Sequence, residues 1–190
     1  LRGADGQPLP GFRDRAILTY SGVRVGIAGA TYDDTPRVAD SGDLKFGPIV
    51  DTIKREADTL RREGADFVVA VVHASRGQDY ALNATGTADL ILSGHDHDLF
   101  INYDERSAMV ESPYDANMIV IVEVAIDVNE ANGRRVTAWR PQFRVIDTAT
   151  VSPDPEVAAA VAAYEGELSR EMDEPLATTA VELDSRNATV

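Results

Sequence analysis

The chain has 190 residues, a length typical of one domain with some additional sequence. Its 32 acidic and 18 basic residues give a formal net charge of −14. This charge argues against a nucleic acid polymer or an anionic membrane as the main partner, because the mean electrostatic field repels both. The absence of cysteine excludes disulfides, thiolate zinc ligands and cysteine nucleophiles. No stretch of sequence approaches the roughly 18 consecutive apolar residues expected of a membrane span.

The first part of the chain predicts a β-hairpin followed by a loop. Two strands are expected at residues 16–20 and 23–30, because each is apolar and the two are separated by Ser-Gly, a turn sequence. Residues 32–47 carry Asp, Pro and Gly without periodicity and are expected to form a loop.

The middle of the chain alternates helices with apolar strands. A helix is expected from residue 48 to about 63, where apolar residues recur at helical spacing, and Gly64 suits the left-handed position that follows a helix. The runs at residues 66–72 and 89–92 are apolar almost throughout, as expected of strands buried on both faces of a sheet. A weak helix at residues 78–83 separates them. Strand, helix and strand in this order predict a βαβ unit with parallel strands.

The strands that follow are expected to be antiparallel. They lie at residues 108–111, 118–128 and 136–146, and the last two are joined by NEANG, a hairpin loop that contains glycine. One face of the 118–128 strand is apolar throughout, whereas the other turns polar along the strand, so one face is expected to be buried. The predicted fold class is therefore α/β, with a mixed sheet, a βαβ unit and antiparallel closing strands.

The sequence predicts a division into three segments. Residues 1–146 form the α/β domain, and residues 147–175 form a linker and a connecting helix. Asp154 is the expected N-cap of that helix and Pro155 its first residue. Residues 176–190 are expected to begin a further domain with a strand.

All three histidines of the chain lie at the ends of predicted strands. His73 ends one buried strand, and His95 and His97 follow the next one within the sequence SGHDH. Because ligands bind at the carboxyl ends of strands in open α/β sheets, we expect the three imidazoles to converge there. Gly94 is expected to allow the sharp turn that this needs. Neutral imidazole suits zinc, manganese, iron or nickel, so a metal site is predicted.

Other residues are weaker candidates for chemistry. A single histidine at a strand end is more often an ordinary polar residue, and the joint placement carries the metal hypothesis. Asp96 is expected to point away from the metal or to support a histidine from behind, and neither Asp96 nor Asp98 is favoured as a ligand. No base and orienting acid can be placed around Ser75, so a serine triad is rejected. The run VGIAGAT departs from the dinucleotide pattern G-x-G-x-x-G, so Gly26 and Gly29 are expected to be close-packing positions.

The runs GVRVGIAGAT, EGADFVVAVVHAS and ADLILSGHDHDLF resemble, in order and spacing, the 5′-nucleotidase family of calcineurin-like metallophosphoesterases. This family includes UDP-sugar hydrolases and 2′,3′-cyclic-nucleotide phosphodiesterases, and its relatives extend to the sulfur-oxidation protein SoxB. The resemblance runs from about Asp5 to Asp127. It implies that residues 1–146 are the C-terminal part of a metallophosphoesterase α/β sandwich, and that residues 176–190 begin a C-terminal substrate-binding domain.

The same resemblance implies the roles of the histidines. His73 and His95 would ligate one metal ion, and His97 would ligate the other. The family's remaining ligands come from D-x-H, G-D and G-N-H-[DE] motifs upstream of the similar region, as does its catalytic His–Asp pair. Neither D-x-H nor G-N-H-[DE] occurs in this sequence, so no catalytic residue is assigned, and the substrate-binding residues are unknown. The implied cofactors are two divalent ions in the parent protein, zinc or manganese, with at most one weakly bound by these 190 residues.

The expected function is that of a piece of a dinuclear metallophosphoesterase that hydrolyses nucleotides or related phosphate esters, inactive by itself. The alternative is a non-catalytic metal-binding or interaction module derived from such an enzyme. The family resemblance also implies a periplasmic or extracellular location. Parallel strands at the ends of a partial sheet would lack partners, so a homodimer formed by edge pairing is expected.

Overall fold

The computed structural model describes residues 1–175, 177 and 178. The chain divides into two compact units, Leu1–Thr150 and Val151–Val190, and each is described by itself. No helix in the described part is long and apolar enough to cross a membrane.

The described part of the second unit is dominated by helix α4 (Pro155–Met172). Its start agrees with the sequence, because the Asp154 carboxylate accepts hydrogen bonds from the backbone N–H groups of Glu156 and Val157 at 2.9 and 3.1 Å. Proline occupies the first helical position, where its missing N–H costs nothing. The strand expected after this helix lies almost entirely outside the described residues.

Six strands of the first unit form one mixed sheet in the order β1-β2-β3-β4-β6-β5. They are β1 (Arg15–Tyr20), β2 (Val23–Ala30), β3 (Phe67–Val72), β4 (Leu90–Ser93), β5 (Phe100–Tyr103) and β6 (Ala108–Glu111). Strands β2, β3, β4 and β6 run parallel, and β1 and β5 are antiparallel at the two edges. The predicted βαβ unit is confirmed.

One detail of the predicted sheet was wrong, and one strand was missed. Residues 108–111 were expected to be antiparallel, but β6 runs parallel to β4 and antiparallel only to β5. The difference arises because β5 was not predicted: its four residues are too few for an alternating pattern to show. The chain runs back along the sheet as β5, antiparallel to β6, and this allows β6 to run in the same direction as β4.

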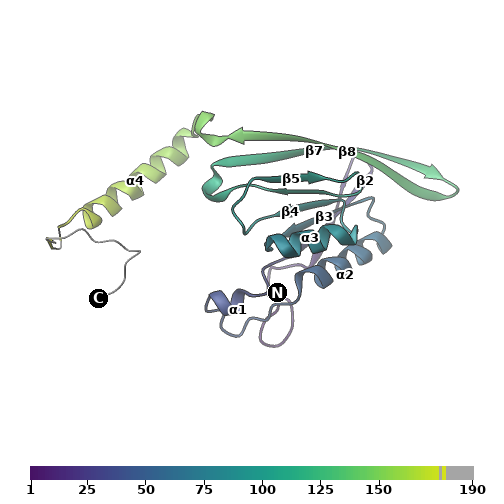
Figure 1. Ribbon diagram of the computed structural model, residues 1–190, viewed down its shortest axis with the longest axis horizontal. Helices are drawn as coiled ribbons and strands as arrows, with labels where there is room; N and C mark the ends of the chain where they lie inside the picture. The colour runs from purple at the N-terminus through teal and green to yellow at the C-terminus, as the bar shows by residue number, and fades with distance from the viewer. Residues whose placement is uncertain (176, 179–190) are drawn as a thin grey trace. The chain divides into compact units, whose positions relative to one another are not determined.

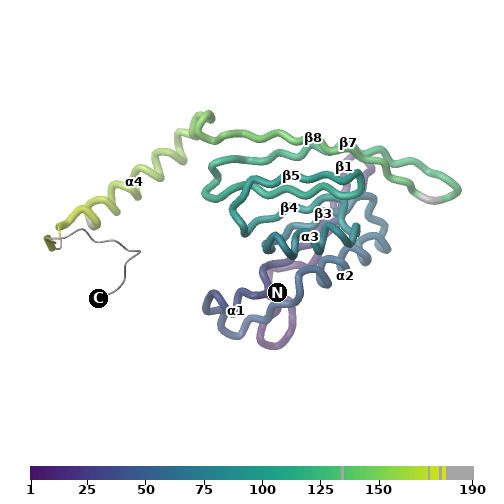
Figure 2. Tube along the Cα trace, in the orientation of Figure 1, coloured from purple at the N-terminus to yellow at the C-terminus, as the bar shows by residue number. Residues whose placement is uncertain are grey.

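Two helices, α2 (Ile49–Arg62) and α3 (Arg76–Thr85), cover one face of this sheet (Figure 1). A short helix, α1 (Thr35–Val38), precedes them and buries none of its residues. The prediction of a helix over residues 48–63 is confirmed, and α3 extends two residues beyond the predicted 78–83 at each end. The short α1 lies within residues 32–47, which were expected to be loop throughout. Figure 2 shows α2 and α3 side by side beneath the strands, in agreement with their mutual contacts.

Helix α2 is held to the sheet by its apolar stripe. Its Ile49, Ile53 and Leu60 side chains are at most 1% exposed, and each such burial contributes about 1.5–3 kcal/mol. As predicted, Gly64 follows the end of the helix, where its φ of +89° permits a hydrogen-bonded reversal of the chain. Gly26 allows close contact, because a Cβ there would lie 3.1 Å from Leu60 Cβ.

Gly29 does not share this role, so its predicted close packing was wrong. A Cβ at Gly29 would meet only Val71 O, at the ordinary contact distance of 3.8 Å. The face of β2 on which Gly29 lies is the one that α2 does not cover, and Gly29 is itself exposed.

A long β-hairpin, β7 (Met118–Ala131) and β8 (Arg134–Asp147), covers part of the other face of the sheet. The predicted alternation along residues 118–128 is confirmed, since side chains of one face are half-buried and most of those on the other are exposed. The ladder extends to a two-residue turn at Asn132 and Gly133, both with positive φ, as in a tight hairpin. Short 3₁₀ helices precede β7 (Tyr114–Ala116) and follow β8 (Thr148–Thr150).

Candidate metal centre

The carboxyl ends of β3 and β4 bring His73 and His95 into contact. His73 follows the last residue of β3, and His95 lies two residues beyond β4. The two strands are parallel neighbours, and the Ala74 N–H donates to the Gly94 carbonyl at 3.0 Å, which joins their ends. As a result, His73 Nε2 lies 3.1 Å from His95 Nδ1. The two side chains thus meet at the sheet edge expected from the sequence.

Tyr32, just beyond β2, covers one side of this histidine pair. Its ring stacks on His95 with centroids 4.3 Å apart and meets His73 edge-on at 6.5 Å. Three neighbouring strand ends therefore contribute to the site, and aromatic contacts of this kind restrict how the imidazoles can rotate.

His97 lies apart from the other two histidines. It is exposed, and its ring is 5.9 Å from that of Tyr114, with the two planes tilted by 47°. Among the described residues, the three histidines do not form a group whose ligand atoms all lie within 4.8 Å of one another. The structure therefore joins His73 to His95 and leaves His97 exposed and outside this pair.

The turn after β4 is built on unusual backbone angles. The φ values of His95 and His97 are +144° and +64°, and Gly94 is not among the described residues with positive φ. The expectation that Gly94 supplies the sharp bend was therefore wrong, because the two histidines adopt these conformations themselves. Such conformations cost about 1–3 kcal/mol each and persist only where surrounding contacts hold them.

Three carboxylates lie together beneath this turn. Oxygen atoms of Asp79, Asp96 and Glu111 are within 4.8 Å of one another. The Arg76 guanidinium lies among them, 2.6 Å from Glu111, 3.4 Å from Asp79 and 4.0 Å from Asp96. Because the Arg76 guanidinium already pairs with these carboxylates and would repel a cation, we assign them to an ion-pair cluster. The carboxylate of Asp96 belongs to this cluster.

Two groups at the site have shifted ionisation. Partial burial, together with the nearby His95, lowers the pKa of His73, which favours the neutral imidazole that binds metal. Burial raises the pKa of Asp79, although the Ser93 hydroxyl donates to its carboxylate at 2.7 Å and Arg76 lies close by.

The histidine pair fits a transition-metal ion. Two nitrogen ligands about 2.0–2.1 Å from one zinc ion lie about 3.3–3.4 Å apart in tetrahedral geometry, and about 2.9 Å apart at a right angle. The distance of 3.1 Å between His73 Nε2 and His95 Nδ1 lies between these limits. Small rotations of the two rings would therefore allow both nitrogens to face one ion.

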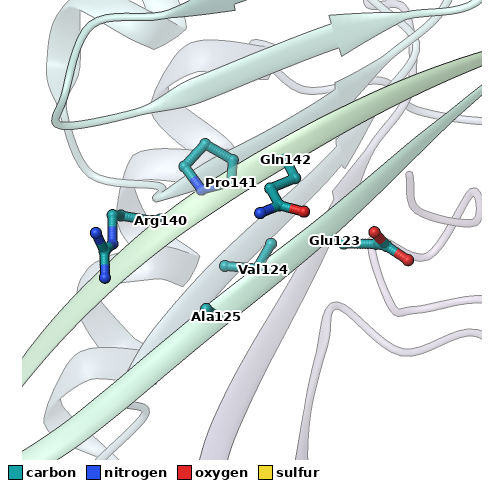
Figure 3. A pocket seen from close by; sticks show the side chains of 6 residues that line it. All are labelled: Glu123, Val124, Ala125, Arg140, Pro141 and Gln142. Atoms are coloured by element: carbon teal, nitrogen blue, oxygen red, sulfur yellow. The ribbon is translucent and has the colours of Figure 1, made fainter.

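A separate pocket lies on the β7–β8 hairpin. It has a volume of about 550 Å³ and is lined by Glu123, Val124, Ala125, Arg140, Pro141 and Gln142, which Figure 3 shows along the two strands. No histidine lines it, and its charged groups, Glu123 and Arg140, are not opposite each other in the ladder. The metal binding expected of the histidines is thus not located there.

Sequence reasoning found the histidines but missed the residues that surround them. Tyr32 lies in a segment without periodicity, and Arg76 and Glu111 are 35 residues apart in the chain. The available signal was positional, since Tyr32, His73, His95 and Glu111 all lie at or just beyond the carboxyl ends of parallel strands. That signal required the parallel direction of β6, which the sequence did not reveal.

No protein-family model matches the chain. Among curated proteins, an apyrase of Aedes albopictus is 31% identical over 105 residues, covering 51% of this chain and 18% of the relative. An apyrase of Anopheles gambiae is 25% identical over 191 residues, covering 88% of this chain and 33% of the relative. Protein 5NUC of Lutzomyia longipalpis is 31% identical over 109 residues, covering 56% of this chain and 19% of the relative. The chain thus spans about a fifth to a third of the length of these relatives.

Solved structures share the fold. The sulfate thiohydrolase SoxB of Thermus thermophilus aligns with a TM-score of 0.67 and 24% identity, covering 90% of this chain and 31% of that one. The calcineurin-like phosphoesterase YfkN of Bacillus subtilis aligns with a TM-score of 0.64 and 16% identity, covering 92% of this chain and 62% of that one. Over the aligned part, the chain therefore has the fold of a calcineurin-like phosphoesterase. Together with the apyrase relatives, these neighbours confirm the predicted resemblance to 5′-nucleotidase-like members of the calcineurin-like phosphoesterases.

Proposed function

We propose that this chain is part of a metal-dependent phosphoesterase that hydrolyses nucleotides or related phosphate esters at a centre of two divalent ions. The carrying observation is the 3.1 Å approach of His73 Nε2 to His95 Nδ1 at the ends of adjacent parallel strands. The similarity to proteins named apyrase supports a nucleotide as substrate. The location that the family resemblance favours is periplasmic or extracellular.

The three histidines have different roles in this proposal. His73 and His95 hold one ion, which their contact and the lowered pKa of His73 support. His97 faces the other ion, and its separation from the histidine pair supports this division. Tyr32, stacked on His95, keeps that imidazole oriented.

Divalent ions in such a centre would polarise the phosphoryl oxygens and lower the pKa of an attacking water. The chain's own contribution is geometric. The sheet fixes the direction of two imidazoles, and the turn after β4 sets where His97 lies. A net charge of −14 does not oppose an anionic substrate here, because bound divalent ions dominate the local field.

Hydrolysis by the complete product of the gene tests this proposal. We expect zinc- or manganese-dependent release of phosphate from ATP, ADP or AMP, with a loss of at least about 100-fold in the His95→Ala variant. Asp98→Asn is the matched control in the same loop and should retain activity. A full-length protein that hydrolyses none of these esters with either metal would contradict the proposed phosphoesterase function and favour the alternative of a non-catalytic module.

The 190 residues alone provide a second test. D-x-H and G-N-H-[DE] motifs, which supply further metal ligands in the related family, do not occur in this sequence. We therefore expect no metal-dependent hydrolysis of AMP, a cyclic nucleotide or bis-p-nitrophenyl phosphate by this chain. Turnover that disappears in His95→Ala would show this expectation to be wrong.

A further inference from the structure

The turn that carries His95 and His97 rests on one buried carboxylate. Glu111 is the last residue of β6, and none of its surface is exposed. Its Oε1 atom accepts hydrogen bonds from two consecutive backbone N–H groups, those of Asp96 at 2.9 Å and His97 at 3.1 Å. Successive N–H groups that converge in this way form a site for a negatively charged oxygen. Glu111 therefore binds the backbone of the turn directly.

Arg76 holds the other oxygen of the same carboxylate. Its Nη2 atom donates to Glu111 Oε2 at 2.6 Å, and its guanidinium lies 4.3 Å from the centre of the Phe100 ring. The two oxygens of Glu111 thus have separate partners, one in the turn and one at the start of α3. This arrangement fixes the rotation of the carboxylate and compensates its buried charge.

The backbone of the turn requires such support. His95 and His97, which flank Asp96, both have positive φ, a conformation that residues with a Cβ rarely adopt. Glu111 accepts hydrogen bonds from the N–H groups of Asp96 and His97. These N–H groups belong to the two peptide units that link His95 to Asp96 and Asp96 to His97, so the hydrogen bonds hold the backbone between the two strained residues. Without this acceptor, the turn could relax to ordinary angles and move both imidazoles.

We propose that Glu111 is a positioning residue that sets the turn geometry and thereby presents His95 and His97 for metal binding. This inference rests on the proposed metal-binding function of those histidines. Glu111 acts through the backbone of the turn and is not itself a ligand, because its Oε1 faces two N–H groups and its Oε2 faces Arg76.

Three variants of the purified chain separate positioning from general stability. Glu111→Ala removes the acceptor. Glu111→Gln keeps a side-chain oxygen at the same distance from the backbone, so it should retain most of the zinc affinity and of the amide protection that Glu111→Ala loses. Glu56→Ala is the matched control, because Glu56 is also buried, at 5% exposure, but its partners are Arg15 and Arg55. Glu111→Ser, which cannot reach both N–H groups, replaces the alanine variant if that variant does not fold.

Two measurements are made on each variant: amide hydrogen exchange without metal, by NMR, and zinc affinity, by calorimetry. In Glu111→Ala we expect faster exchange at the Asp96 and His97 amides and zinc binding weaker by about 10- to 100-fold, as for other residues that orient metal ligands. Glu56→Ala should leave zinc affinity and these two amides unchanged, although it lowers the unfolding temperature.

The outcomes distinguish this inference from the function on which it rests. If the wild-type chain binds no zinc, the metal-binding function fails and the inference falls with it. If the wild type binds zinc and Glu111→Ala binds it equally well, the inference alone is overturned. An equal loss of affinity in Glu56→Ala would also overturn it, because the effect would then reflect stability and not the turn.

Discussion

Asp66 shows how much one buried carboxylate can connect. Its side chain is 3% exposed and accepts hydrogen bonds from Arg135 Nε and Nη2, both at 2.7 Å, and from the Arg24 backbone N–H at 2.8 Å. It thereby joins the start of β3 to β2 and to the β7–β8 hairpin. The hydrogen bonds with Arg135 lower the pKa of Asp66 below its usual value.

A pH dependence follows from this pair. Because the pKa is lowered by folding, the stabilisation is fully present above the ordinary carboxyl value and is lost as the pH falls through the folded-state value. We expect Asp66→Asn to lower the free energy of unfolding at pH 7 by about 1–2 kcal/mol, since Arg135 is half exposed and partly screened. The difference from wild type should shrink below about pH 4. Urea unfolding of both proteins at pH 7, 5 and 3 measures this difference in unfolding free energy. A difference that grows as the pH falls would contradict the prediction.

At the level of single residues, the sequence predicted positions better than contacts. The placement of His73 and His95 at neighbouring strand ends followed from the apolar runs before them. The support from Glu111 could not be predicted, because it depends on which strand pairs with β4. The bend at His95 could not be predicted either, since residue type favours Gly94 for that conformation.

Among the elements, the β7–β8 hairpin depends on an aromatic contact with the sheet. Trp139 of β8 packs edge-on against Phe67 of β3 with centroids 5.2 Å apart, and its ring is 5.4 Å from that of Tyr103 in β5. Trp139 is also the single tryptophan of the chain, so its fluorescence reports on this contact alone.

We expect the hairpin and the sheet to unfold together. Trp139→Phe should lower the free energy of unfolding by about 1 kcal/mol, and Trp139→Ala by about 2 kcal/mol or more, because a half-buried tryptophan loses less than the 3–5 kcal/mol of a core residue. In the wild type, the urea transitions followed by Trp139 fluorescence and by far-UV circular dichroism should coincide. A fluorescence transition at clearly lower urea would show that the hairpin undocks first.

The elements that the sequence predicted well are those with many residues and one period. Helix α2 has about four turns of apolar spacing, and β7 alternates regularly from Val122 to Asn129, so both were recognised. The four-residue β5 carries too little pattern, and the direction of β6 depends on β5. Strand order and direction are tertiary properties, which local periodicity does not encode.

At the scale of the whole molecule, the sheet edges determine how copies could associate. The edges are the antiparallel strands β1 and β5, whereas unpaired parallel strands were expected. β1 exposes Leu18 at 42% and Tyr20 at 64%, so an apolar edge remains open in the described part of the chain. Strand β8 of the separate β7–β8 ladder is a poorer site for pairing, because its Pro141 cannot donate a backbone hydrogen bond.

We therefore retain the prediction of a homodimer and assign it to β1. Light scattering of the purified chain at high concentration should give twice the monomer mass. Leu18→Lys, which places a charge on the open edge, should shift the population to the monomer. Tyr80→Lys is the control, since Tyr80 is 53% exposed but lies on α3, away from this edge. A monomeric wild type would contradict edge pairing.

Zinc titration by calorimetry tests the metal hypothesis most directly, with the wild type, the three single His→Ala variants and Asp98→Asn compared. We predict one weak site in the wild type, binding weakened by about 10-fold or more in His73→Ala and His95→Ala, a clear but smaller loss in His97→Ala, and little change in Asp98→Asn. If His73→Ala binds zinc as well as the wild type does, the histidine pair is not a metal site and His73 is an ordinary polar residue at a strand end.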